Sequence, residues 1–185
     1  MEKIIELTDK ANEYFSNGEY KEALKYYYSA LTEDVENSIC HCNIGITYEM
    51  LRETELAVAF YKKAIRLDDK NVRAINNLAR IYIDEVKDFD IATKYLDYAI
   101  ETAPNDAEAY NLYGNLSLIK KDYEIAKSYF KKSIFLDEYY FKNYFDLAKA
   151  LIELNNIDEA KEMLDKSLEL RADFIPAIEL RKSLN

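Results

Sequence analysis

Small apolar residues recur along the chain at a spacing of 34 or 35 residues. One column consists of Ala23, Ala57, Ala92, Ala126 and Ala160. A second column consists of Ala11, Gly45, Ala79, Gly114 and Ala148. Large residues keep the same register four positions after the first column, at Tyr27, Tyr61, Leu96, Phe130 and Leu164. Columns that stay in phase over five periods indicate five copies of one structural repeat.

The columns predict a pair of helices in each repeat. About twelve residues separate the two small columns, which accommodates the end of one helix, a short turn and the start of the next. Small residues at matching places let the two backbones approach closely, and the large residue one turn later fills the space beside them. Each repeat is then a helical hairpin with an apolar face that only a neighbouring hairpin can cover. The predicted fold class is all-α, a solenoid of five hairpins.

Two stretches carry a resemblance to a known family. The sequences NGEYKEALKYYYSAL (17–31) and NIGITYEM (43–50) resemble the second-helix and first-helix motifs of the tetratricopeptide repeat. The large aromatic residue usual near the start of the first helix is present only as Tyr110 and Tyr144, and the proline usual at the repeat end only as Pro104. The resemblance covers residues 4–174 and implies a right-handed superhelix.

The register sets the repeat boundaries within a single array, residues 1–185. The five repeats run 4–37, 38–71, 72–106, 107–140 and 141–174. The third repeat is one residue longer, and we expect a longer surface turn within IDEVKDFD (83–90). Residues 175–185 predict a capping helix whose apolar stripe is Ala177, Leu180 and Leu184. We therefore expect an array that is complete at this helix.

Both cysteines and the single histidine are consecutive, at Cys40, His41 and Cys42. On a helix, consecutive side chains point about 100° apart, so these three cannot converge on one metal ion. His41 occupies a column otherwise held by large residues, which places it in the packing between helices. We expect Cys40 in the interior and Cys42 as a thiol on the inner surface. The tyrosines at 26–28 and 139–140 are also expected to pack between repeats.

Composition and charge narrow the class of protein. The net charge of −10 argues against nucleic acid as a partner, because such binders depend on neutralising phosphates. Apolar runs of signal-peptide or membrane-span length are absent from the sequence, so we expect no membrane association and a cytoplasmic location. It also has no glycine-rich phosphate loop and no histidine available for catalysis. The prediction is a non-catalytic protein with no cofactor.

The resemblance implies that the first helices of the repeats line a concave face that binds a peptide or a partner's helix. Arg73, Asn77 and Arg80 are spaced i, i+4 and i+7 on one such helix, so they form one stripe. A second stripe has an aromatic residue between two cations. The candidate peptide-binding residues are Asn12, Asn43, Arg73, Asn77, Arg80, Lys142, Phe145 and Lys149. Solvated surface charge is the alternative interpretation of both stripes.

We therefore expect an adaptor or scaffold that binds a segment of a partner protein carrying acidic groups. Asparagine both donates to and accepts from a peptide backbone, and arginine can hold a carboxylate in two hydrogen bonds. The alternative is a self-assembling, homo-oligomeric scaffold. It is suggested by Ile4, Ile5 and Leu7, which have no preceding repeat to cover them.

Overall fold

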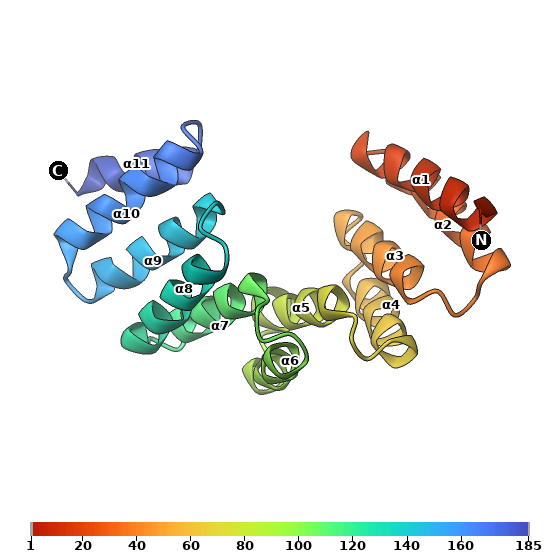
Figure 1. Ribbon diagram of the computed structural model, residues 1–185, viewed down its shortest axis with the longest axis horizontal. Coiled ribbons are helices and arrows are strands. Elements are labelled where there is room, and N and C mark those ends of the chain that lie inside the picture. The colour runs from red at the N-terminus through yellow and green to blue at the C-terminus, as the bar shows by residue number, and fades with distance from the viewer. Residues whose placement is uncertain (1, 185) are drawn as a thin grey trace. The chain divides into compact units, whose positions relative to one another are not determined.

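The computed structural model describes residues 2–184, which form helices and no strand, so the predicted all-α fold class is confirmed. The chain falls into two compact units, Met1–Tyr95 and Leu96–Asn185. The division lies within α6 (Phe89–Thr102). Figure 1 shows the helices in chain order. None of the helices in the described part of the chain is long and apolar enough to cross a membrane.

The N-terminal unit contains two helix pairs and the start of a third. Its elements before α6 are α1 (Glu2–Ser16), α2 (Tyr20–Glu33), α3 (Ser38–Met50), α4 (Thr54–Leu67), α5 (Val72–Ile81) and the π-helix η1 (Tyr82–Val86). Helix α1 packs on α2 and α3 on α4, while α2 also contacts α3 and α4 contacts α5. Each hairpin thus covers the face of the next.

The C-terminal unit continues the same pattern after α6. Its elements are α7 (Ala107–Ile119), α8 (Tyr123–Leu136), α9 (Phe141–Glu153), α10 (Ile157–Leu170) and α11 (Ile175–Ser183). Helix α7 packs on α8 and α9 on α10, as Figure 1 shows, and α11 packs on α10. Ala177 of α11 is fully buried, and Leu180 and Leu184 pack against the same core. The last helix therefore lays its apolar stripe on the end of the unit.

The small residues of one helix contact the large side chains of its paired helix, as the repeat columns predict. A Cβ atom added to Gly45 would lie 2.7 Å from the ring of Tyr61, and one added to Gly114 would lie 2.5 Å from the ring of Phe130. Both rings are fully buried. Ala148 and Leu164, which hold the equivalent positions in the last repeat, are also buried. In the second and fourth repeats glycine thus stands where the partner in the next helix is a ring, whereas Ala11 faces Tyr27 in the first repeat.

A left-handed residue lies in the turn between the two helices of each hairpin. The residues with positive φ are Gly18, Arg52, Lys87, Lys121 and Asn155. Glycine adopts this conformation without cost, whereas a side chain with a Cβ atom is strained in it. Gly18 therefore suits its turn best and Asn155 tolerates the conformation, whereas Arg52, Lys87 and Lys121 are strained in theirs.

The prediction of a longer surface turn in the third repeat is wrong. The extra residue is absorbed in η1, where the helix widens over Tyr82–Val86, and the connection to α6 consists of Lys87 and Asp88. A π-helix places one additional residue in a turn while it keeps the backbone hydrogen-bonded. Tyr82 and Ile83 are buried there, so their burial favours the widened helix over an exposed loop.

Helix α3 carries the three consecutive cysteine and histidine residues as packing side chains. His41 is buried, stacks on the ring of Phe60 and has Nε2 2.9 Å from the carbonyl oxygen of Val35. The thiol of Cys40 donates to the carbonyl oxygen of Tyr27 at 3.3 Å. Cys42 is 2% exposed, so the expectation that its thiol lies on the inner surface is wrong. Residues 2–184 contain no cluster of three His, Cys, Asp or Glu side chains that could hold a metal ion.

The tyrosines and the apolar residues of the first helix only partly follow the packing that the sequence predicts. Tyr28 meets the ring of Phe60 in the second hairpin edge-on, which confirms its expected place between repeats, whereas Tyr26 stacks on Tyr14 within the first hairpin. Tyr139, however, is 76% exposed, so its expected place between repeats is wrong. At the N-terminus, Ile4 and Leu7 pack against the core of the first hairpin, while Ile5 is exposed. The first helix therefore leaves much less apolar surface open than its sequence suggests.

Candidate partner-binding surfaces

In the N-terminal unit, two of the candidate asparagines hold fixed side-chain partners. Asn12 on α1 accepts a hydrogen bond of 2.6 Å from the hydroxyl of Tyr27. Asn43 on α3 accepts one of 3.1 Å from Nη1 of Arg73 on α5. The second bond joins neighbouring repeats, so Asn43 stabilises the stack and also orients the exposed side chain of Arg73. The bond of Asn12, in contrast, stays within the first hairpin.

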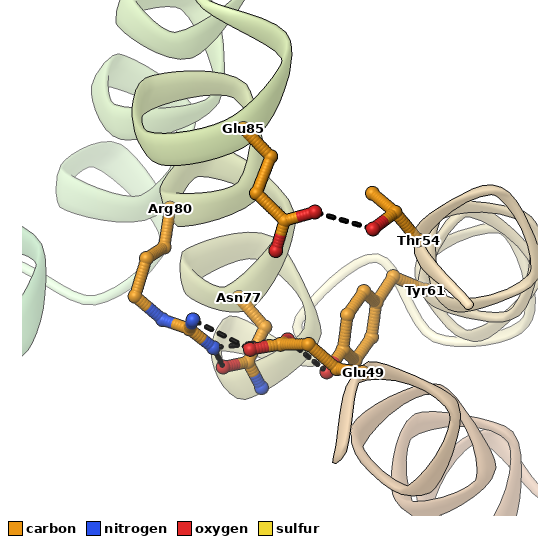
Figure 2. A network of polar contacts seen from close by, with 6 residues as sticks. All are labelled: Glu49, Thr54, Tyr61, Asn77, Arg80 and Glu85. Carbon is orange, nitrogen blue, oxygen red and sulfur yellow. Dashed lines mark hydrogen bonds and ion pairs between the residues drawn. The ribbon is translucent and has the colours of Figure 1, made fainter. Parts of the chain in front are cut away.

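A network of charged and polar groups surrounds Arg80 (Figure 2). Its guanidinium donates to Glu49 on α3 at 2.6 and 3.1 Å and to the side-chain oxygen of Asn77 at 2.8 Å. The hydroxyl of Tyr61 donates to the same carboxylate at 3.1 Å. Arg80 therefore has a carboxylate partner within the chain, which a ligand's carboxylate would have to displace.

The protonation of this network follows from its burial. Burial raises the pKa of Tyr61, and the charge of Glu49 raises it further, so the hydroxyl remains a donor at neutral pH. Partial burial of its carboxyl group raises the pKa of Asp84 in η1, and the charges of Arg80 and Lys87 act in the opposite direction. The network thus combines a charged ion pair with a neutral phenol.

The π-helix adds one more acidic group beside this network. Glu85 of η1 accepts a hydrogen bond from the hydroxyl of Thr54, at the start of α4 (Figure 2). A hollow of about 500 Å³ lies here, lined by Glu49, Met50, Arg52, Thr54 and Glu85. We call it the N-terminal hollow. Its wall contains both members of the Thr54–Glu85 contact together with the charged Glu49 and Arg52 and the apolar Met50.

In the C-terminal unit, the candidate stripe lies along α9. Lys142 is exposed, whereas Lys149 forms an ion pair of 2.6 Å with Asp146. The ammonium of Lys149 also lies 5.2 Å from the centre of the Phe145 ring. Asp146 and Asn143 each accept a hydrogen bond of 3.1 Å from the side-chain amide of Asn111 on α7. The same carboxylate therefore serves both the ion pair and the contact between repeats.

An aromatic cluster extends this stripe beyond the residues that the sequence suggested. Phe174 meets Phe141 edge-on with ring centres 4.8 Å apart and Phe145 at 5.1 Å. The guanidinium of Arg171 lies 5.0 Å from the centre of the Phe141 ring. Phe141 begins α9 and Phe174 directly precedes α11, so neither lies on the stripe of Lys142, Phe145 and Lys149 that the sequence suggested. Their spacing of 33 residues, one short of the repeat, was the available signal.

Comparisons with known proteins agree with this architecture. Models of the tetratricopeptide repeat match residues 8–72, 50–116 and 117–182. The chain is 33% identical over 136 residues to the photosystem I assembly protein Ycf3 of Rippkaea orientalis, a match that covers 59% of this chain and 79% of that protein. It is 26% identical over 125 residues to the type IV pilus assembly protein PilF of Pseudomonas aeruginosa, which covers 67% of this chain and half of that one.

Two solved structures share the fold over nearly the whole chain. The tetratricopeptide-repeat protein TTC0263 of Thermus thermophilus superposes with a TM-score of 0.82 at 17% identity and covers 98% of both chains. YrrB, described as a repeat protein with an unusual peptide-binding site, gives 0.66 at 24% identity and covers 95% of this chain and 90% of its own. With the family models matching most of its length, the chain belongs to the tetratricopeptide repeat family.

Proposed function

We propose that the chain is a non-catalytic adaptor that binds an acidic segment of a partner protein on the first helices of its repeats. The observation that carries this proposal concerns Arg73 and Lys142. They stand 69 residues apart, at equivalent positions two repeats removed, and both side chains are exposed. Neither forms an ion pair with any residue in the described part of the chain. In a chain of net charge −10, such cations favour a partner with carboxylates.

Within the N-terminal unit, Arg73 is the stronger anchor for such a partner. Arg80 would have to give up Glu49 first, whereas the side chain that holds Arg73 is the neutral amide of Asn43. Hydrogen bonds to charged groups contribute roughly 1.5–3 kcal/mol each. Asn43, Asn77 and Arg80 support this site mainly by fixing the surface around it.

The relatives support an interaction role without naming a partner. Two of them are assembly proteins, for photosystem I and for the type IV pilus, and one structural neighbour has a peptide-binding site. The match to PilF spans only half of that protein, so the similarity does not identify the partner of this chain.

The test is capture of a partner from the lysate of the source cells, read by mass spectrometry. Wild type is compared with the double variant Arg73→Glu, Lys142→Glu and with the control Lys161→Glu on α10, each checked for folding by circular dichroism. We expect a protein that is captured by wild type and the control and lost by the double variant. Equal capture by all three would contradict the proposal.

We also infer that the chain works in a reducing compartment, the cytoplasm. Cys40 and Cys42 are free thiols, and both are buried in α3. Cell fractionation with an epitope tag would test this location, and recovery in an oxidising compartment would contradict it.

Self-assembly is the second candidate function, and the exposed Ile5 is the observation that favours it. Its side chain is 57% exposed on the open face of α1. Sedimentation velocity over a hundredfold range of concentration tests the idea. A constant monomer mass would remove it, and a dimer lost in Ile5→Glu would support it.

A further inference from the structure

A second hollow, of about 340 Å³, lies in the C-terminal unit where the ends of α7 and α9 meet α11. Its walls are mainly aliphatic, formed by Leu118, Ile119, Ile152 and Leu180, and Tyr123 is a further lining residue. Lys121 and Lys149 stand beside these walls, and Glu153 is the acidic lining residue. We call this the C-terminal hollow. Its volume lies at the lower end of the range of ligand pockets in proteins.

The two hollows occupy equivalent places in the repeat. Counting two repeats, or 69 residues, leads from Met50, Arg52 and Thr54 of the N-terminal hollow to Ile119, Lys121 and Tyr123 of the C-terminal hollow. It also leads from Arg80, the partner of Glu49 beside the N-terminal hollow, to Lys149. The same step leads from Glu49 to Leu118. Where the N-terminal hollow has a carboxylate paired with Arg80, the C-terminal hollow therefore has an aliphatic side chain.

Because Leu118 replaces the acid, Lys149 has no carboxylate on α7 at the position where Arg80 finds Glu49 on α3. Lys149 pairs instead with Asp146, one turn earlier on its own helix, and its side chain stays 38% exposed. Lys121 is exposed and forms no ion pair with any residue that the structure describes. Two cations thus border an apolar hollow, and a carboxylate from another molecule can take the place that Glu49 has in the N-terminal hollow.

We propose that the C-terminal hollow binds a leucine-like side chain of a partner segment that carries acidic residues on both sides of it. The apolar walls receive the aliphatic group, and Lys121 and Lys149 pair with the flanking carboxylates. Glu153 opposes the same carboxylates and therefore lowers the affinity. The proposal rests on the proposed adaptor function and adds the chemistry of the segment and its place on the chain.

The probe is a fluorescein-labelled peptide of sequence GSEDLEDSG with an amidated C-terminus, titrated with the full chain in an anisotropy assay. A second peptide replaces the leucine by glycine, and a third replaces every acidic residue by its amide. A fourth ends at the leucine with a free carboxylate. Binding is measured at low and high salt to separate the contribution of charge. The field of an exposed charge falls off over about 10 Å at 0.1 M ionic strength and over a shorter distance at higher salt.

Three variants separate the parts of the hollow. Leu118→Glu installs the carboxylate that the N-terminal hollow has at this position, Lys149→Met removes a cation and Glu153→Gln removes the opposing charge. Lys161→Met on α10, outside the lining, is the control for Lys149→Met. Circular dichroism and thermal unfolding establish that each variant is folded.

We expect the first peptide to bind to wild type. The glycine and amide peptides should bind to wild type at least tenfold more weakly, and the first peptide should bind at least tenfold more weakly to Leu118→Glu and to Lys149→Met. Glu153→Gln should bind more tightly, and Lys161→Met should match wild type. Equal affinity for the leucine and glycine peptides, or for wild type and Leu118→Glu, would overturn the proposal. So would tighter binding of the free-carboxylate peptide, which would assign the site to chain ends, or a dimer of the protein that Leu118→Glu dissociates.

The two proposals fail in different ways. A partner that is lost with Arg73→Glu, Lys142→Glu but retained by Leu118→Glu would leave the adaptor function standing and refute the hollow. Capture of no partner by wild type, together with no peptide binding, would refute both.

Discussion

Arg80 and Glu49 face each other across neighbouring repeats, and the guanidinium donates two hydrogen bonds to the carboxylate, at 2.6 and 3.1 Å. Both side chains are partly shielded, at 33% and 18% exposure. An ion pair of this kind loses little to solvent screening compared with one on the open surface. The pair therefore acts as a link between α3 and α5.

Removal of this link should destabilise the N-terminal unit. Arg80→Met takes two hydrogen bonds from Glu49 and leaves it the one from the hydroxyl of Tyr61, and we expect the free energy of unfolding to fall by about 1–3 kcal/mol. Urea unfolding at neutral pH measures the change. Lys25→Met is the control, since Lys25 and Glu22 form an exposed, solvent-screened pair whose loss should leave the free energy of unfolding nearly unchanged. Equal losses in the two variants would contradict a linking role.

The glycine at 114 should be sensitive to a single added methyl group. Gly114→Ala brings a Cβ atom to 2.5 Å from the buried ring of Phe130, and overpacking of this kind costs about 1–3 kcal/mol. Thermal unfolding of the variant should show a lower midpoint. The double variant Gly114→Ala, Phe130→Leu reproduces the pair at Ala148 and Leu164, and it should recover part of the loss. Loss without any recovery would show that the ring is not the obstacle.

The left-handed turn residues offer a way to stabilise the chain. Arg52 has φ of 62°, a conformation that costs a residue with a Cβ atom about 1–2 kcal/mol. Arg52→Gly relieves that strain and loses part of the gain to backbone entropy, so we expect a net stabilisation of about 0.5 kcal/mol. The matched control is Gly18→Ala, which introduces the same strain at φ of 79° and should destabilise. Opposite signs for the two variants are the expected result of chemical unfolding.

Alkaline pH should unfold the first hairpins through two buried groups. Burial raises the pKa of the Cys40 thiol to about 12 and that of Tyr27 to about 12. Because the folded chain keeps these protons above the pKa values of the unfolded chain, about 8.5 for cysteine and 10 for tyrosine, stability is complete below about pH 8.5 and falls between that pH and about 12. Urea midpoints at pH 7, 9 and 10.5 measure the fall.

The control for this pH dependence is Cys40→Ala, which removes one of the two titrating groups. Its stability should be lower at neutral pH and should fall less between pH 9 and 10.5 than that of wild type. In the native state, the buried thiols of Cys40 and Cys42 should also react slowly with a thiol reagent. A parallel pH profile for the variant would contradict the role of Cys40.

The sequence predicted the features that depend on periodic packing. The pairs of Gly45 with Tyr61 and Gly114 with Phe130 follow from residue size and spacing, and the structure has them in contact. The partner of Arg80 could not be predicted in the same way, because several inward columns offer acids and only the approach of α3 to α5 selects Glu49. The spacing of 31 residues between this acid and its cation becomes a signal once the helix pairing is known.

Two errors have a common physical origin. Cys42 was assigned to the inner surface and the extra residue of the third repeat to a loop, both from position within the repeat alone. Burial of neighbouring apolar groups decides these cases: Cys42 is 2% exposed, and Tyr82 and Ile83 are buried in the π-helix. Register tells which residue types align, but it does not tell how tightly the next hairpin covers them. The candidate binding residues remain predictions, with their contacts now defined.

The π-helix makes the third repeat a poor target for exchange in protein engineering. Repeat proteins are commonly engineered by exchanging repeat units of one fixed length. Deleting a single residue from Tyr82–Val86 to match the length of the other repeats would turn every later side chain in that helix by about 100° around its axis. Glu85 would swing away from Thr54, and the wall of the N-terminal hollow would open. A redesign of this chain by exchange of repeat units should therefore keep residues 72–106 intact.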